Sequence, residues 1–495
     1  MKQLLQILSL MIPLVAPAQK WDYQWPMGYS NAPLADVSIL DFNEGEVSTN
    51  VLFQTVDDFT IGSTGSFICD KSSGEVILMT NGCRVYDADL QVVSGSDTLS
   101  PGPTYNNYCE DEYPAYQSIL ILPNPTTDSI YYVLHKDGEI NNTFQDVVSH
   151  KLYLTTIVRY SDNSFTVVEK RLLLDTLMNV GKLTACINHD GTKWWTWTTG
   201  YDTNKFYKFL IGGTEIVEGP FEQEIGDPLY NKILGIGQTA FSPNTKVLGL
   251  NSGDKKVKLY DFDNETGELS NFRAIPYPDD GDGARGLVFS PNSQLVYVGT
   301  VFNLYQIDML NSSVEHIAYH MSYDEFNWPV TIGYLHLGPD CRLYADCGST
   351  SHFIHVIHHP DEKGEGCEFQ ARAIPTLSTI NFEFPNIPMY RFDGACDSSI
   401  TFPVSGLAIE LDGQPQAVSV APNPCSGVMT VTLQVQATRQ VRLLLFDMMG
   451  RSVLDKALTA ARNELDVEGL APGLYFYEVR DEQRLLGSGK LVRVE

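Results

Sequence analysis

Three similar phrases at equal intervals in the middle of the chain limit most strongly what this sequence can fold into. Each phrase places a proline, followed by Asn or Asp, between two short apolar runs, and the prolines are Pro243, Pro291 and Pro339. Proline presets φ, and Asn or Asp tolerates the tight turn after it, so the apolar runs predict antiparallel strands around a loop. A repeat of about 40 to 50 residues with several strands in each unit is typical of a β-propeller blade.

Similar turns continue this pattern toward the N-terminus. Strand pairs turn at Ser73, near residues 123–128 and at Asp190. Strands near residues 36–53 are expected to share one further blade with strands near 385–392, because a blade that mixes both chain ends hides the sheet edges. The sequence therefore predicts an all-β fold with a seven-bladed β-propeller. Six or eight blades stay open, because the early units are irregular.

Changes in composition divide the chain into four parts. Residues 1–18 carry one Lys, an apolar run and a small-x-small end, which predicts a secretory signal peptide. The propeller is expected over residues 19–393, and a linker with Ser, Gly and Pro over 394–416. Residues 417–495 show several short alternating strands with Gly turns, which favours a small immunoglobulin-like β-sandwich.

The charge balance and the hydropathy limit the partners. The chain has 33 basic and 61 acidic residues and a formal net charge of −28. A surface of this sign repels nucleic acid and anionic lipid. Apart from the signal segment, no stretch approaches the roughly 18 apolar residues of a membrane helix. We therefore expect an exported protein with no nucleic-acid partner and no transmembrane segment.

The C-terminal unit carries a set of turn and core residues in a distinctive order. It opens on APNPCSG, continues with LLLFDMMGRSV and GLYFYEV, and ends on GKLVRVE; its marker residues are Pro422, Asn423, Pro424, Gly427, Asp447, Gly450, Gly473, Tyr475 and Lys490. In spacing, order and terminal position these phrases resemble the type A sorting domain of the type IX secretion system found in Bacteroidetes. The resemblance implies recognition by the type IX secretion machinery, followed by secretion or attachment to the outer-membrane surface.

The first part of the chain is similar to the propellers that Bacteroidetes often join to such tails. The phrases that carry this likeness are LMTNGCRVYD, LTACINHDGTKWW, LYDFDNETGELS and LGPDCRLYADCG. The chain departs from the pattern at Cys341, where a small turn residue such as Gly is more usual. The resemblance implies no activity.

Nine cysteines in an exported chain predict disulfide bonds. Cys69 and Cys83 flank one apparent hairpin and form the first candidate pair. Cys347 and Cys367, on neighbouring strands of one blade, form the second. Several free buried thiols stay open as the alternative.

Three tryptophans are candidates for stacking on a sugar ring or a peptide. They are Trp194, Trp195 and Trp197 in a run that is interpreted as a strand. The strand period of two places Trp195 and Trp197 on one face and Trp194 on the other, and packing between blades uses large aromatic residues. A core position is therefore favoured over a binding role.

One acidic loop is a candidate calcium site. Asp261, Asp263 and Glu265 resemble half of a calcium-binding loop, but Gly267 comes one position late and the closing Glu is missing. A solvated hairpin loop is favoured, and no other cofactor is expected.

Four histidines in the phrase SHFIHVIHHP are the densest possible metal ligands; they are His352, His355, His358 and His359. Residues three apart on a strand point to opposite faces, whereas zinc needs ligands that converge. A structural or solvent-facing role is therefore favoured.

No catalytic residues are assigned, because neither a nucleophile elbow nor a P-loop occurs. Adjacent carboxylates at Asp57, Asp58, Asp279 and Asp280 only suggest where a glycosidase site could be sought. The leading hypothesis is a non-enzymatic binding or scaffold protein for an extracellular glycan, peptide or protein. The alternatives are a polysaccharide hydrolase or lyase with its site in the propeller funnel, and a purely structural adhesion protein.

Overall fold

The computed structural model describes residues 19–28, 37–53, 61, 64–109, 113–141, 146–213, 216–229, 236–278, 283–324, 326–380, 384–390, 395–403, 418–421, 425–433, 441–446, 451–460, 462–480 and 485–494. The chain divides into two compact units, Met1–Phe402 and Pro403–Glu495, each described by itself below. The expected signal peptide lies outside the described residues.

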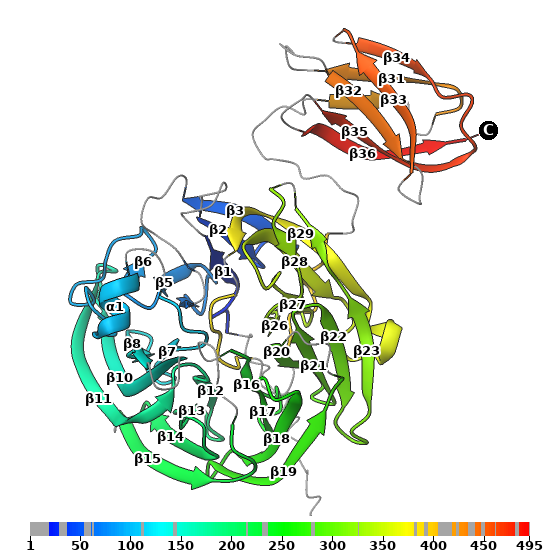
Figure 1. Ribbon diagram of the computed structural model, residues 1–495. Coiled ribbons are helices and arrows are strands. Elements are labelled where there is room, and N and C mark those ends of the chain that lie inside the picture. Colours follow the sequence, from blue (N-terminus) through cyan, green and yellow to red (C-terminus); the bar gives the residue numbers. More distant parts are fainter. Residues whose placement is uncertain are drawn as a thin grey trace, which may run out of the picture. The chain divides into compact units, whose positions relative to one another are not determined.

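Seven antiparallel sheets lie around one axis in the described part of the first unit, which confirms the seven-bladed propeller (Figure 1). The first three blades are β1 (Gln24–Met27), β2 (Val37–Asp41) and β3 (Ser48–Phe53); β4 (Ser66–Cys69), β5 (Val76–Thr80) and β6 (Val85–Asp87); and β7 (Ile119–Pro123), β8 (Ile130–Lys136), β10 (Asp146–Arg159) and β11 (Phe165–Asn179), with β9 (Glu139–Asn141) beside β10.

The remaining four blades have four strands each, hydrogen-bonded in chain order. They are β12 (Thr184–Ile187), β13 (Trp194–Thr199), β14 (Lys205–Ile211) and β15 (Val217–Glu224); β16 (Thr239–Phe241), β17 (Val247–Asn251), β18 (Lys256–Asp263) and β19 (Glu268–Pro276); β20 (Ala284–Phe289), β21 (Leu295–Thr300), β22 (Asn303–Asp308) and β23 (Val314–Tyr319); and β26 (Leu335–Leu337), β27 (Leu343–Ala345), β28 (Ser351–Ile357) and β29 (Phe369–Ile380).

Burial decreases from the axis to the rim of a blade. Every residue of β21 is buried, whereas β23 at the rim is half-buried or exposed. The first strands of neighbouring blades contact one another around the axis, as β16 does with β12 and β20 (Figure 1). Apolar side chains of adjacent sheets interdigitate, for example Leu259 with Phe289 and Val298 in one cluster. The core is therefore a ring of sheet-to-sheet interfaces.

The proline-marked phrases form the first hairpin of their blades, as the sequence predicts. In the first phrase, Ser242 Oγ accepts the backbone N–H of Val247 at 3.0 Å and lies 2.7 Å from Asn244 Oδ1. The second phrase repeats the arrangement, with Leu295 N 3.0 Å from Ser290 Oγ. In these two phrases the serine before the proline thus closes the turn that the proline begins.

Ring closure differs from the expectation that both chain ends share a blade. The described first blade, β1 to β3, consists of N-terminal strands, while residues 384–390 run among the first strands of other blades. Their backbone N–H groups at Asn386 and Met389 donate to Gly65 O at 2.7 Å and Ala185 O at 3.1 Å. The segment also holds two prolines, which lack the N–H that a continuous ladder needs.

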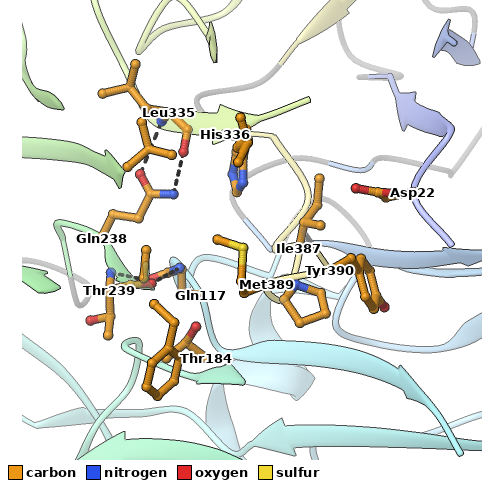
Figure 2. A pocket seen from close by; sticks show the side chains of 15 residues that line it. Asp22, Gln117, Thr184, Gln238, Thr239, Leu335, His336, Ile387, Met389 and Tyr390 are labelled. Atoms are coloured by element: carbon orange, nitrogen blue, oxygen red, sulfur yellow. Dashed lines mark hydrogen bonds between the residues drawn. The ribbon is translucent and has the colours of Figure 1, made fainter. Parts of the chain in front are cut away.

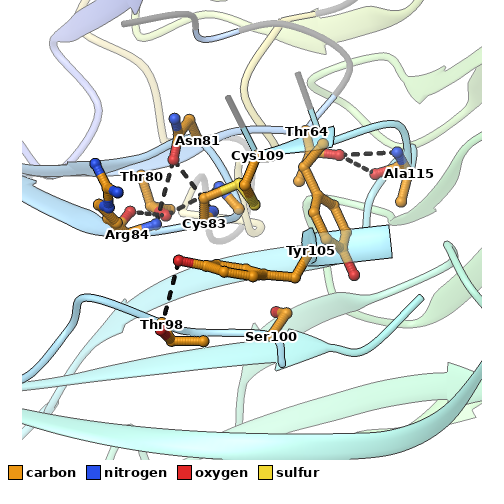
Figure 3. The surroundings of a disulfide bond; sticks show 12 residues. Thr64, Thr80, Asn81, Cys83, Arg84, Thr98, Ser100, Tyr105, Cys109 and Ala115 are labelled. Carbon is orange, nitrogen blue, oxygen red and sulfur yellow. Dashed lines mark hydrogen bonds between the residues drawn. A yellow bond between two sulfur atoms is a disulfide. The ribbon is translucent and has the colours of Figure 1, made fainter. Parts of the chain in front are cut away.

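The predicted bond between Cys69 and Cys83 is wrong. Cys69 lies opposite Val76 at the turn end of the β4–β5 hairpin, whereas Cys83 follows Thr80 at the other end. Cys83 instead bonds to Cys109, with a Cα–Cα distance of 5.7 Å, and Cys69 is a buried free thiol (Figure 3). The sequence suggested a simple hairpin, but the strands leave the two cysteines at opposite ends.

The predicted bond between Cys347 and Cys367 is also wrong, and both are buried free thiols. Cys347 Sγ contacts Phe353 O near the start of β28. Cys367 lies near the other end of that strand, two residues before Phe369, which pairs with Ile357. The second disulfide joins Cys341 to Cys396 at a Cα–Cα distance of 5.4 Å.

This second disulfide fastens residues 395–402, which the sequence assigned to the linker, to the propeller. Thr401 also exchanges backbone hydrogen bonds with the first blade, donating to Gly45 O at 2.8 Å and accepting from Val47 N at 2.9 Å. The stretch therefore joins the last blade to the first, across the point where the ring closes.

The second unit contains two packed antiparallel sheets, as expected for a β-sandwich. One sheet holds β30 (Val418–Ala421), β31 (Val428–Leu433) and β34 (Arg462–Asp466); the other holds β33 (Ser452–Leu458), β32 (Val441–Phe446), β35 (Gly473–Arg480) and β36 (Leu485–Arg493). Its core includes the fully buried Met429, Leu443 and Val479. The unit therefore buries an apolar core of its own.

Candidate binding face

The described residues that lead into the first strands of the second to last blades lie at one end of the ring, which we call the connection face. Successive strands alternate in direction, so a four-stranded blade ends at the end where the next blade begins. These residues are 64–65, 113–118, 180–183, 236–238, 283, 320–324 and 326–334. Loops at this end can vary without disturbing the sheets, so ligand contacts in propellers belong here.

Two insertions build up the connection face. Between the second and third blades, helix α1 (Pro103–Tyr108) is held down by the bond from Cys83 to Cys109, beside the contact of Thr64 Oγ1 with Ala115 O at 2.6 Å (Figure 3). Between the sixth and last blades, β24 (Ser322–Tyr323) and β25 (Pro329–Val330) form a small hairpin.

Two buried lysines close the space between successive connections. Lys136 Nζ donates to Asn179 O at 2.8 Å, and Lys182 Nζ donates to Ile236 O at 2.7 Å and Asn251 O at 3.0 Å. Both side chains are almost fully buried, and burial with the nearby Lys182 lowers the pKa of Lys136 well below its usual range. Their carbonyl partners assign them a structural role.

Amide side chains link the first strands of different blades around the axis (Figure 2). Gln117 exchanges two hydrogen bonds with the backbone of Thr239, at 2.8 and 3.1 Å. Gln238 does the same with Leu335, at 2.7 and 3.1 Å. Asn386 Nδ2 donates to Ile119 O and Leu183 O, both at 2.9 Å. These side chains tie first strands together across the axis.

The cavity that remains on the axis is small. Its volume is about 30 Å³, and it is lined by Thr184, Val288, His336 and residues 387–390, among others. This is space for roughly two water molecules, whereas ligand pockets span about 300 to 1,000 Å³. The described residues around this cavity therefore leave no room for a sugar inside it.

His336 is the titratable ring at this cavity (Figure 2). It packs edge-on against Trp25 at 6.0 Å and Phe384 at 5.9 Å between ring centroids. Burial lowers the pKa of His336 to about 3, so the ring is neutral at physiological pH. These aromatic contacts indicate that His336 serves to pack the core.

A charged cluster lies at the mouth of the axis on the connection face. Tyr116 and Tyr334 stack with ring centroids 5.3 Å apart, and Arg285 hydrogen-bonds to Tyr116. The Arg285 Nε is buried and has no hydrogen-bond partner among the described residues. Guanidinium groups bind carboxylate and similar oxygens through such donors.

Asp346 fixes the loop beside this cluster. Its carboxylate accepts the backbone N–H groups of Gly348 at 2.7 Å, Tyr334 at 3.1 Å and Phe384 at 3.3 Å. Burial raises the pKa of Asp346 to about 7, although these N–H groups and Arg285 act in the opposite direction. The carboxylate thus anchors Phe384, at the start of the described segment 384–390, to the last blade.

The three tryptophans lie in the core rather than on a binding surface. Trp194 is fully buried in one cluster and donates from Nε1 to Pro123 O at 2.7 Å. Trp195 and Trp197 are 3% and 1% exposed and belong to the neighbouring cluster. The predicted alternation of faces is confirmed, and the stacking role is wrong because the rings have no exposed face.

The acidic loop does not gather its three carboxylates. Asp261 is engaged by Arg273 at 2.8 Å and by Asn271 at 2.9 Å. Asp263 Oδ1 accepts the backbone N–H groups of Glu265 at 2.9 Å and Thr266 at 3.1 Å, closing its own turn. Within the described ranges, no cluster of three or more His, Cys, Asp or Glu is arranged to hold a metal ion.

The four histidines have separate protein partners, as the structural interpretation predicts. His355 is fully buried, with Nε2 2.7 Å from Thr331 O. His352 Nδ1 lies 3.6 Å from Asp324, His358 Nε2 lies 2.9 Å from Gln370, and the exposed His359 lies 3.4 Å from Glu368. They share no ligand position.

The described marker residues of the C-terminal unit support its strands. Gly427 O accepts Val467 N at 2.8 Å, and Tyr475 is 7% exposed in the sandwich core, with its hydroxyl 2.7 Å from Ala471 O. Gly473 begins β35, and the Lys490 backbone pairs with Phe476. The other markers lie outside the described residues; they are Pro422, Asn423, Pro424, Asp447 and Gly450. The adjacent carboxylates considered for a glycosidase site also lie outside them; these are Asp57, Asp58, Asp279 and Asp280.

Sequence reasoning missed the amides and charges at the axis. One signal could have found some of them, because Gln117 and Gln238 stand just before the first strand of their blades. A polar residue repeated at this position indicates a role at the axis. No comparable signal marks Arg285 or Asp346, whose neighbours come from distant blades.

Family models match two regions of the chain. Residues 419–493 match the secretion system C-terminal sorting domain, which confirms the resemblance of the tail. Residues 236–327 match the model described as lactonase, 7-bladed β-propeller. No curated protein matches the chain.

Solved structures of propellers resemble the chain at low identity. A putative 6-phosphogluconolactonase from Bacteroides uniformis is 12% identical, with a TM-score of 0.38, covering 90% of this chain and 100% of its own. The Cps50 β-propeller domain of Myceliophteria thermophila is 10% identical, with a TM-score of 0.38 and coverages of 67% and 93%. The periplasmic gluconolactonase of Pseudomonas aeruginosa is 14% identical, with a TM-score of 0.37 and coverages of 78% and 94%.

These structures indicate no activity for this chain.

Among the described residues, no helix has the length and apolar character needed to cross a membrane. The chain joins a seven-bladed β-propeller to a domain that matches the secretion-system sorting family, which implies secretion or location at the cell surface.

Proposed function

We propose that this is an exported binding protein, delivered by type IX secretion, whose propeller recognises an extracellular ligand on its connection face. The match of residues 419–493 to the sorting domain is the observation that carries this proposal. Residues 1–18 support it, because their pattern is that of a secretory signal peptide. The formal charge of −28 favours a partner without strong negative charge.

The location of the ligand site follows from how the axis is filled. Hydrogen-bonded amides and the segment 384–390 occupy the interior. A ligand therefore meets the protein at an outer surface, and the connection face carries both insertions and the Arg285 cluster. Rigid sheets below such loops hold contact residues in place, which reduces the ordering cost of binding.

Export is tested in a Bacteroidetes host with and without a working type IX secretion system. The full chain is expected outside the cell or on its surface in the first host and inside the envelope in the second. A chain that ends after Phe402 is expected inside the envelope in both. The proposal fails if the full chain and the shortened chain distribute alike.

Lactone hydrolysis is a second candidate function, favoured by the match of residues 236–327 to the lactonase propeller model. Arg285 lies within this range, and its guanidinium could stabilise the oxyanion that forms when water attacks a lactone carbonyl. The test is release of acid from a panel of sugar lactones. Turnover that Arg285→Ala lowers at least about a hundredfold would favour the enzyme, and no turnover above buffer would favour the binding protein.

A further inference from the structure

Arg285 carries a positive charge that the described residues leave without a direct counter-charge. It lies near the start of β20, at the connection face, and the residue is half-buried. Its guanidinium hydrogen-bonds to Tyr116, whereas the buried Nε has no hydrogen-bond partner in the described part of the chain. Among these residues, no carboxylate forms an ion pair with Arg285. The guanidinium therefore keeps donors and a charge that a ligand could use.

Asp346 is near enough to attract Arg285, but its hydrogen bonds go elsewhere. Its carboxylate accepts backbone N–H groups from Gly348, Tyr334 and Phe384, at 2.7, 3.1 and 3.3 Å. These contacts use the carboxylate to hold the backbone in place. Asp346 therefore weakens the field of Arg285 without being the direct partner that the guanidinium lacks.

Two buried lysines show how the propeller compensates such charges at other positions. Lys208 and Lys258 are 2% and 0% exposed, and their Nζ atoms lie 2.6 Å from carboxylate oxygens of Glu268 and Asp254. A largely buried cation without such a partner costs free energy, and an anion that binds to it removes this cost. Folds retain such costs at binding sites, so the unpaired state of Arg285 indicates a position that a ligand completes.

The chemistry of this position favours a ligand with one carboxylate. The planar fork of a guanidinium matches the two oxygens of a carboxylate. A phosphate group carries up to two negative charges, and the net charge of −28 disfavours a ligand with more charge than one cation can neutralise. The axial cavity of about 30 Å³ is too small for the rest of the ligand, which must therefore lie on the connection face.

We propose that Arg285 binds the carboxylate of a small monocarboxylic acid at the connection face, an inference that rests on the proposed function and names its ligand class. The experiment is titration calorimetry of the full chain with gluconate, galacturonate and acetate. The methyl ester of galacturonate, which lacks the charge, and inorganic phosphate are the comparison ligands. At least one of the acids is expected to bind, and to bind at least about tenfold more tightly than either comparison ligand, because both lack a singly charged carboxylate.

The test variants are Arg285→Gln, which removes the charge, and Arg285→Lys, which keeps the charge but loses the planar fork. Arg285→Gln is expected to weaken binding of the acid at least about tenfold, and Arg285→Lys to weaken it less. The matched control is Arg273→Gln, which removes the same charge from the rim strand β19, where Arg273 pairs with Asp261. It should bind the acid as the wild type does.

Melting temperatures separate a binding role from a structural one. Because the charge of Arg285 has no direct partner, Arg285→Gln is expected to melt no lower than the wild type in the absence of ligand. A lower melting temperature together with unchanged binding of the acid would assign Arg285 a structural role. The comparison of galacturonate with its methyl ester uses the wild type alone and does not depend on how any variant folds.

Four outcomes overturn the inference: no binding of any of the three acids, equal binding of galacturonate and its methyl ester, tighter binding of phosphate, or full binding by Arg285→Gln. Each of them would leave the proposed function standing with a ligand of another class. Failure of export would instead overturn the proposed function, whatever the titrations show.

Discussion

His355 shows how one buried side chain holds another residue in a strained position. Its Nδ1 accepts the backbone N–H of Arg372 at 3.0 Å, and its Nε2 donates to Thr331 O at 2.7 Å. Arg372 has φ of 52°, which residues other than glycine rarely adopt. Only the neutral ring can accept at Nδ1, so the backbone conformation at Arg372 depends on the protonation state of His355.

This dependence predicts a loss of stability in acid. Burial lowers the pKa of His355 to about 3, whereas an unfolded histidine has about 6.5. Because the folded pKa is depressed, the contribution is present above about pH 6.5 and is lost as pH falls toward 3. Between pH 6.5 and 4 the free energy of unfolding should fall by roughly 3 kcal/mol more in the wild type than in His355→Gln.

Urea unfolding at a series of pH values measures this difference. Other histidines titrate in both proteins and therefore cancel in the comparison. Equal pH dependence of the two proteins would show that His355 is not held neutral by the fold.

Asn386 is the second residue on which several strands depend. Its side chain donates to two buried carbonyls, and Gln117 Nε2 donates to its Oδ1 at 3.3 Å. Asn386→Ala leaves these groups without partners and should lower the free energy of unfolding by about 2 to 5 kcal/mol. Asn50→Ala, in an exposed position, is the control and should change it by less than about 0.5 kcal/mol. Similar melting of the two variants would contradict the role of the amide.

At the scale of elements, the turn after Pro339 explains the departure at Cys341. This residue has φ of 66°, the conformation for which glycine is more usual, and it carries the disulfide to Cys396. A side chain is retained at a glycine-like position because it fastens the segment that joins the last blade to the first.

The disulfide should therefore stabilise the ring. The bond closes a loop with a sequence separation of 55 residues, for which chain entropy gives about 4 kcal/mol. Cys341→Gly/Cys396→Ser relieves the left-handed turn and should still unfold at lower denaturant concentration than the wild type. Cys83→Ser/Cys109→Ser, which opens the other bond, serves as the comparison. An unchanged midpoint in the first variant would show that the bond does not restrain the ring.

At the scale of the molecule, the position where the propeller ends can be tested by truncation. Residues 395–402 carry Cys396 and pair with the first blade, and the second unit has its own core. A chain ending after Phe402 should melt like the propeller of the full chain. A chain ending after Asp393 should melt at least a few degrees lower, because it lacks the disulfide. Calorimetry measures both, and equal melting would place the end of the propeller at residue 393.

The architecture could be predicted from the local repeat, whereas the disulfide bonds that fasten the ring could not. Pro243 and Pro291 mark turns whose partners lie a few residues away, so the pattern alone shows the hairpins. Cys83 and Cys341 bond to partners 26 and 55 residues distant, and spacing does not identify such partners. The tryptophans could be placed on their faces because strand alternation is local.

The sequence alone predicted a propeller, with seven blades favoured over six or eight, together with the sandwich and the sorting tail, because each rests on short-range patterns of turns and strands. Only the tertiary structure decided that residues 384–390 run along the axis and that Gln117 and Gln238 link first strands across it. These features depend on which blades meet around the ring. The position of Gln117 and Gln238 before their first strands hints at a role at the axis, but a local pattern cannot identify partners that lie so far away in the chain.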